Sequence, residues 1–242
     1  MKRTAFFVLN CIISLALAAV CAYVCAVDGA TKNLPDAFAV FFSVMFLSVP
    51  LSCFLHELGH VICGATVKII AIPEFKFFSS SSVKLKPRTD KNLKPKIIFT
   101  ALGGLTVNLI CIILGIIALC MHAVPAEISG ILPFSFYLFM LNALPFRYSG
   151  GKSDGLIVYD LIKNTDESKV MLAVLCVQAQ IIKGKPVSEA DGELLFGVPQ
   201  IREDDESFIA LTELRYEYCL AKGQTEEAQK YKARLDDLQK YL

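Results

Sequence analysis

The sequence predicts an all-α integral membrane protein with about four transmembrane helices, a short β-hairpin at the membrane surface and a helical cytosolic tail. Three observations carry this prediction. Of the 242 residues, 55% are hydrophobic and the mean hydropathy is +0.53, which is too apolar for an ordinary soluble domain. The apolar residues fall into four long segments separated by polar stretches. The Lys and Arg residues gather in one of the intervening loops.

The four apolar segments cover about residues 4–27, 37–67, 97–121 and 128–146. The first follows Lys2 and Arg3 and resembles a signal peptide, but its apolar core is longer than a signal peptide needs, so we expect it to be retained. The second exceeds a hydrocarbon core of about 30 Å, so it must tilt or protrude. Pro50 is expected to kink this second segment.

Loop charges predict the orientation of these segments. The loop between the second and third segments carries eight cations: Lys68, Lys76, Lys84, Lys86, Arg88, Lys91, Lys94 and Lys96. The two other loops hold only Lys32. The positive-inside rule therefore places this loop and both termini in the cytoplasm. Residues 1–165 are then the core embedded in the lipid bilayer, and residues 166–242 are the cytosolic tail.

The second segment contains an H-E-x-x-H motif, His56-Glu57-Leu58-Gly59-His60. Histidines four residues apart project from one face of a helix and can bind the same metal ion. The glutamate beside them is placed to act on a water at that metal. Ionisable residues inside a membrane segment are costly, so this cluster is a candidate functional site. The alternative is a pair of core or interfacial histidines that bind no metal.

A catalytic zinc site needs a third protein ligand. His122 and Glu127 lie at the opposite end of the apolar segments, roughly one membrane thickness away. Asp154 follows the fourth segment, where the chain returns to the cytoplasmic face, and is the best candidate. Its alternative role is the N-cap of a helix over residues 156–163, and a cap and a ligand are not exclusive. Cys63, one helical turn beyond the motif, is a weaker candidate.

At this point the sequence resembles the site-2 protease family of intramembrane zinc metalloproteases. The matching stretches are HELGH at 56–60, Gly103-Gly104-Leu105-Thr106-Val107-Asn108, Asn142-x-x-Pro145 and Asp154-Gly155. In that family the aspartate of the D-G motif is the third zinc ligand. The resemblance, over about residues 40–165, implies that His56, His60 and Asp154 bind Zn2+ and that Glu57 is the general base.

The resemblance also implies that Asn108 and Asn142 lie near the active site. Asn108 could orient a substrate carbonyl or stabilise an oxyanion, or it could form an interhelical hydrogen bond. One departure from the family is the link over residues 147–153, RYSGGKS, where family members often have a short Pro-rich link. If this link displaces Asp154, then Asp160, two helical turns later, is the fallback ligand.

Two other regions have clear patterns. Residues 69–87 alternate apolar and polar side chains around four serines, which predicts a hairpin at the membrane surface. Its open edge could receive an unwound substrate as an added strand, or the hairpin could simply rest on lipid headgroups. In the tail, helices are expected over residues 168–182, 205–222 and 224–242, with the last two paired around Gly223.

The leading hypothesis is a zinc-dependent intramembrane endopeptidase that cleaves a transmembrane protein or peptide near the cytoplasmic face. The resemblance implies a minimal, multi-pass enzyme of the cell membrane. The alternative is a non-catalytic scaffold or regulator of the same fold, which binds a protein partner through its helical tail. A transporter is less well supported, because only four segments and no inverted repeat are visible. No basic face with interleaved aromatic residues supports nucleic-acid binding.

Overall fold

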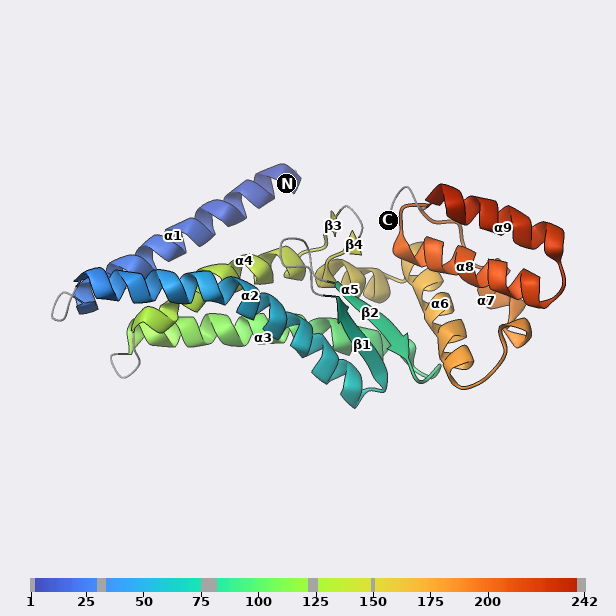
Figure 1. The fold of residues 1–242 in the computed structure, drawn as a ribbon, viewed down its shortest axis with the longest axis horizontal. Helices are drawn as coiled ribbons and strands as arrows, with labels where there is room; N and C mark the ends of the chain where they lie inside the picture. Colours follow the sequence, from blue (N-terminus) through green and yellow to red (C-terminus); the bar gives the residue numbers. More distant parts are fainter. Residues whose placement is uncertain (1–2, 30–33, 75–81, 122–125, 149–150, 239–242) are drawn as a thin grey trace.

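The computed structural model describes residues 3–29, 34–74, 82–121, 126–148 and 151–238, and these are mostly helical (Figure 1). Four of the described helical stretches are long and apolar enough to cross a membrane. They are α1 (Arg3–Gly29), α2 (Leu34–Thr66), α3 (Leu93–Cys120) and a fourth in which the 3-10 segment η1 (Ala126–Ile131) leads into α4 (Leu132–Ala143). The four apolar segments expected from the sequence are therefore confirmed as helices.

Two of these helices differ in detail from the expectation. The fourth was expected to run to residue 146, but α4 ends at Ala143, and Leu144 is already extended with φ −90° and ψ 148°. Pro145 explains this end, because a proline disfavours the helical conformation of the residue before it. In α2 the chain remains helical through Pro50, and Figure 1 shows that this helix bends partway along its length.

The helices α2 and α3 approach each other closely at two glycines. A Cβ atom on Gly59 would lie 2.5 Å from the Gly103 carbonyl oxygen, so only glycine allows this backbone contact. Both η1 and α4 pack against α2 and α3, and α1 lies against α4, which makes an elongated bundle (Figure 1). One buried cluster of the bundle is formed by Cys21, Cys25, Phe41, Ile112, Ala126 and Leu132.

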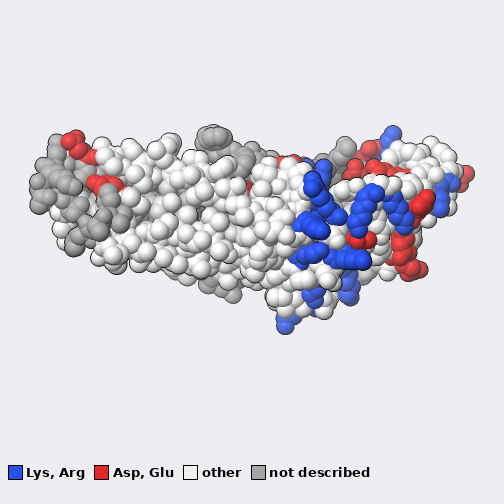
Figure 2. Space-filling model, turned by 90° about the horizontal axis from the view of Figure 1, so that it is seen from below, with Lys and Arg blue, Asp and Glu red and all other residues white. Residues whose placement is uncertain are grey.

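The outside of this bundle is apolar. Large side chains such as Leu15, Tyr23 and Phe46 are 70%, 71% and 77% exposed. Figure 2 shows a long face that is almost free of charged residues between a few acids at its far end and a band of Lys and Arg next to the tail. An apolar surface of this extent is unusual for a soluble monomer and marks a region that contacts a membrane or another protein.

Two hairpins lie at the end of the bundle that faces the tail. The strands β1 (Ile69–Glu74) and β2 (Ser82–Pro87) pair antiparallel, with Ile69 opposite Pro87, so the predicted hairpin is confirmed. Its turn, with most of the serine run, lies outside the described residues. A second, unpredicted hairpin joins β3 (Arg147–Tyr148) to β4 (Gly151–Lys152) and leads directly into α5 (Asp154–Lys163).

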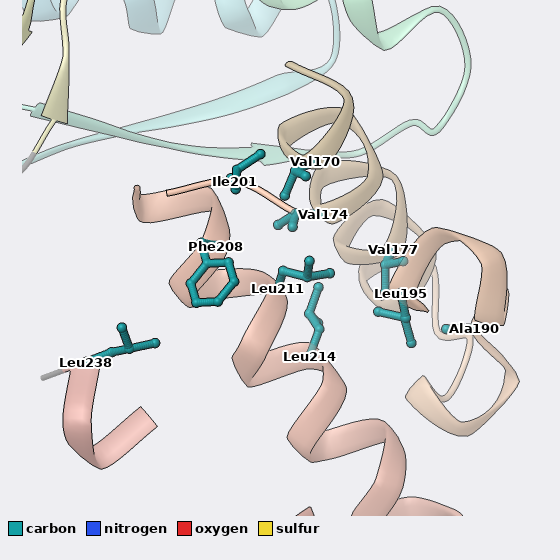
Figure 3. Close-up of a cluster of buried hydrophobic side chains, with 10 residues drawn as sticks. All are labelled: Val170, Val174, Val177, Ala190, Leu195, Ile201, Phe208, Leu211, Leu214 and Leu238. Carbon is teal, nitrogen blue, oxygen red and sulfur yellow. The ribbon is translucent and has the colours of Figure 1, made fainter. Parts of the chain in front are cut away.

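The tail is a small helical unit beyond these hairpins. Its main helices are α6 (Asp166–Ile182), α7 (Gly192–Phe196), α8 (Glu206–Ala221) and α9 (Thr225–Leu238), with a 3-10 turn, η2 (Val187–Glu189), before α7. The expected pair of helices around Gly223 is confirmed. This residue has a φ of 73°, which lies in the left-handed region that glycine adopts more easily than other residues. Figure 3 shows the apolar core of the tail, in which Val170, Val174 and Val177 of α6 meet Leu211 and Leu214 of α8.

The tail core supplies the first prediction. Leu211→Ala should lower the free energy of local unfolding of the tail by about 2–5 kcal/mol, because the side chain is 1% exposed and its removal leaves a cavity. Hydrogen exchange of the α6 and α8 amides in the full-length protein measures this change. The control is Leu220→Ala on the same helix, where the leucine is 54% exposed and the expected cost is under about 0.5 kcal/mol. Equal effects of the two variants would contradict the assigned core.

Candidate metal centre

Three side chains from two distant parts of the chain meet at one point. His56 and His60 project from α2, and Asp154 is the first residue of α5. The two Nε2 atoms lie 3.2 Å apart, and Asp154 Oδ2 lies 3.2 Å from His56 Nε2 and 3.5 Å from His60 Nε2. All three residues are buried, at 5–9% exposure. Among the described residues, no other group of His, Cys, Asp or Glu side chains is arranged to hold a metal ion.

The spacing and chemistry of these atoms fit a metal ion. A tetrahedral zinc with bonds of about 2.0–2.1 Å needs ligand atoms about 3.3–3.4 Å apart, and the three observed separations bracket this value. Asp154 Oδ2 is buried and has no hydrogen-bond partner. A buried carboxylate oxygen without a donor is costly, and a cation between the three atoms would remove that cost.

The far side of each imidazole is held by α3. His60 Nδ1 donates a hydrogen bond to the Thr100 carbonyl oxygen at 2.8 Å, which leaves Nε2 free to bind a metal. Asn108 Nδ2 lies 3.0 Å from His56 Nδ1, and Asn108 Oδ1 is buried without a hydrogen-bond partner. Turning the amide over lets Oδ1 accept the proton of His56 Nδ1, so both imidazoles then present Nε2 to the site.

Two glycines make room for this arrangement. A Cβ on Gly104 would lie 2.6 Å from both His56 Cε1 and His60 Nε2, so the imidazoles pack directly on the α3 backbone. A Cβ on Gly155 would lie 3.0 Å from the Asn142 carbonyl oxygen and closer still to that of Ala143. The glycine after Asp154 therefore allows α5 to begin against the end of α4.

Asp154 is not the helix cap that the sequence left open as its alternative role. The cap of α5 is Ser153, whose Oγ accepts a hydrogen bond from the Leu156 amide and donates one to the Leu144 carbonyl oxygen. The N-cap interpretation of Asp154 is therefore wrong by one residue. Because its carboxylate does not cap α5, it is available to bind a metal ion.

Glu57 is buried at 5% exposure and lines the same cavity as the three candidate ligands. This cavity has a volume of about 220 Å³. Its walls include Val83 and Leu85 of β2, together with Tyr148 and Lys152 of the second hairpin. The hairpins therefore border a partly open cavity that also contains the Glu57 carboxylate and the three candidate ligands.

The other residues that the sequence offered as candidates are not among the three candidate ligands. Asn142 lines the cavity, and its Nδ2 donates a hydrogen bond to the Leu138 carbonyl oxygen at 3.3 Å. The Asp160 carboxylate is 3.4 Å from Lys152 Nζ and does not join the three ligands. Cys63 faces Gly103, and Glu127 lies in η1. His122 is outside the described residues.

Comparisons with family models, curated proteins and solved structures gave no match to this chain. The candidate site therefore depends on its own geometry. The hydrogen bond from His60 to the Thr100 carbonyl oxygen could not be predicted from the sequence, because any residue type has a backbone carbonyl. Sequence reasoning also missed the role of Gly104 beside the imidazoles, for which the only signal is a glycine one helical turn before Asn108.

The packing of the imidazoles on α3 gives a direct prediction. Gly104→Ala should weaken metal binding by more than about tenfold, because the added methyl group displaces the Nε2 atoms that must converge. Titration of the purified, metal-free protein with zinc measures the affinity. Gly192→Ala is the control, since a Cβ there meets no atom within 4 Å. Unchanged affinity in Gly104→Ala would show that the ion binds elsewhere.

Proposed function

We propose that this protein is a zinc-dependent intramembrane endopeptidase that hydrolyses a peptide bond in a membrane-embedded protein or peptide. The observation that carries the proposal is the meeting of His56, His60 and Asp154 in one cavity with Glu57. Two imidazoles and one carboxylate with a fourth position for water are the ligand set of catalytic zinc sites, whereas structural sites are closed by four protein ligands. The resemblance to site-2 proteases points to the same chemistry.

The apolar bundle supports a place for this site within the membrane. Four apolar helices with exposed Leu, Ile and Phe side chains suit a multi-pass protein of the cell membrane. The band of Lys and Arg in Figure 2 suits the cytoplasmic face, with both termini on that side. His56 lies ten residues before the end of α2 at Thr66, which corresponds to about 15 Å along the helix axis. This position suits cleavage on the cytoplasmic side of the bilayer.

The residues of the site can perform peptide hydrolysis together. A zinc ion held by His56, His60 and Asp154 would supply Lewis acidity for a water and for the scissile carbonyl. Glu57 accepts the proton of the water and delivers it to the leaving amine. The side chains of β2 and the second hairpin form part of the cavity wall, and an extended peptide could lie along the edge of β2.

Glu57 and His56 should have separable roles. Glu57→Gln should retain bound zinc but reduce cleavage of a model transmembrane substrate in liposomes by at least about 100-fold, because the proton acceptor is lost. His56→Ala should lose both zinc and cleavage, because a ligand is lost. Elemental analysis and product formation are measured on the same samples. Zinc binding by wild type without turnover of any candidate substrate would instead favour the non-catalytic scaffold.

Asp154 can be tested without disturbing the helix that it begins, since Ser153 provides the cap. Asp154→Asn should weaken zinc binding by more than about 100-fold, a larger effect than the loss of a group that only orients a ligand, because the one anionic ligand of the three is lost. Hydrogen exchange of the α5 amides should stay as in wild type. If the variant keeps its zinc and its activity, Asp154 is not a ligand.

A further inference from the structure

A buried group of ion pairs joins the tail to the loop that carries Asp154. Asp205 precedes α8, and its Oδ2 lies 2.7 Å from Arg147 Nη1 and 2.9 Å from Lys152 Nζ. Both cations belong to the second hairpin, one on each strand. The Asp205 side chain is 2% exposed and that of Lys152 is 11% exposed, so these charges are largely removed from water.

Two more acids complete the group. Asp160 of α5 lies 3.4 Å from Lys152 Nζ, and Glu167 of α6 lies 3.8 Å from Arg147 Nη2. Only Asp205 contacts both cations. Removing one partner of a buried ion pair leaves the other charge uncompensated, which is strongly unfavourable. The hairpin is therefore expected to depend on Asp205 more than on either of the other acids.

Asp205 divides its two carboxylate oxygens between two tasks. Its Oδ1 accepts a hydrogen bond from the Ser207 amide at 3.0 Å and caps α8, while Oδ2 faces the hairpin cations. Burial alone would raise the pKa of Asp205, but Lys152 and Arg147 hold it below its usual value. Asparagine is as good a cap as aspartate but carries no charge, so Asp205→Asn separates the two tasks.

The hairpin in turn leads to the metal centre. It consists of two residue pairs, Arg147 with Lys152 and Tyr148 with Gly151, and a hairpin of this size is not stable alone. Lys152 is two residues before Asp154, and the Ser153 amide donates a hydrogen bond to the Phe146 carbonyl oxygen. A shift of the hairpin therefore moves the start of α5.

We propose that Asp205 is a positioning residue of the metal centre: by holding the second hairpin, this tail carboxylate keeps Asp154 against His56 and His60. The inference rests on the proposed metal site. It makes the tail a part of the active centre, because withdrawal of α8 from the hairpin would release the third ligand. Asp205 lies 51 residues beyond Asp154 in the sequence, yet it acts on that ligand through a single layer of side chains.

The test compares Asp205→Asn with Asp191→Asn in the full-length protein. Asp191 is also an N-cap, with its Oδ1 accepting from the Glu193 amide, but it is exposed and caps α7 away from the hairpin. Two quantities are measured: hydrogen exchange of residues 147–153 in the metal-free protein, and the zinc dissociation constant. Asp205→Asn should speed exchange in the hairpin and weaken zinc binding about 10–100-fold, the size of effect expected when a metal ligand loses the contacts that position it. Asp191→Asn should change neither.

Combining Lys152→Gln with Asp205→Asn distinguishes positioning from a general loss of structure. The double variant should lose less zinc affinity than the product of the two single losses, because each single change leaves a partner charge uncompensated. The α8 amides should stay protected in Asp205→Asn. Suppose that wild type binds zinc, that the zinc dissociation constant of Asp205→Asn stays within about twofold of it, and that amide exchange of residues 147–153 is unchanged. This result would overturn the role of Asp205 but leave the proposed function intact. Wild type that binds no zinc overturns the proposed function, and with it the role of Asp205.

Discussion

Two imidazole nitrogens and a carboxylate oxygen are buried within 3.5 Å of one another between α2 and α5. Such electron-rich atoms repel each other unless a cation or protons lie among them, so the architecture around them must be rigid enough to keep them together. Glycines supply this rigidity through backbone contact. Gly59 lets α2 lie on α3, Gly104 lets the imidazoles lie on α3, and Gly155 lets α5 begin against α4.

The hairpins and the tail complete the site from the other side. The β2 strand and the second hairpin form the walls of a cavity that contains Glu57, and Asp205 of the tail holds the second hairpin through Arg147 and Lys152. The apolar bundle contributes two of the candidate ligands through α2, and the third comes from the start of α5, directly after the second hairpin.

Much of this arrangement could be predicted from the sequence, because its signals are local. The long apolar runs predicted the helices, and the spacing of His56 and His60 predicted a shared face of α2. Other features have no local signal. Strands of two residues show no periodicity, so the hairpin of β3 and β4 was missed, and the cap of α5 was placed one residue late, at Asp154 instead of Ser153. The ion pairs of Asp205 also have no local signal, since Arg147 and Lys152 lie far away in the sequence.

The identity of the atoms around the metal tests the central claim most directly. X-ray absorption at the zinc edge of the purified full-length protein reports which elements bind the ion and at what distance. The site described here predicts one zinc per chain with nitrogen and oxygen neighbours at about 2.0–2.2 Å and an imidazole signature from two histidines. A zinc–sulfur distance of about 2.3 Å would place the ion at cysteines instead, and protein purified without zinc that takes up none on titration would contradict the metal centre altogether.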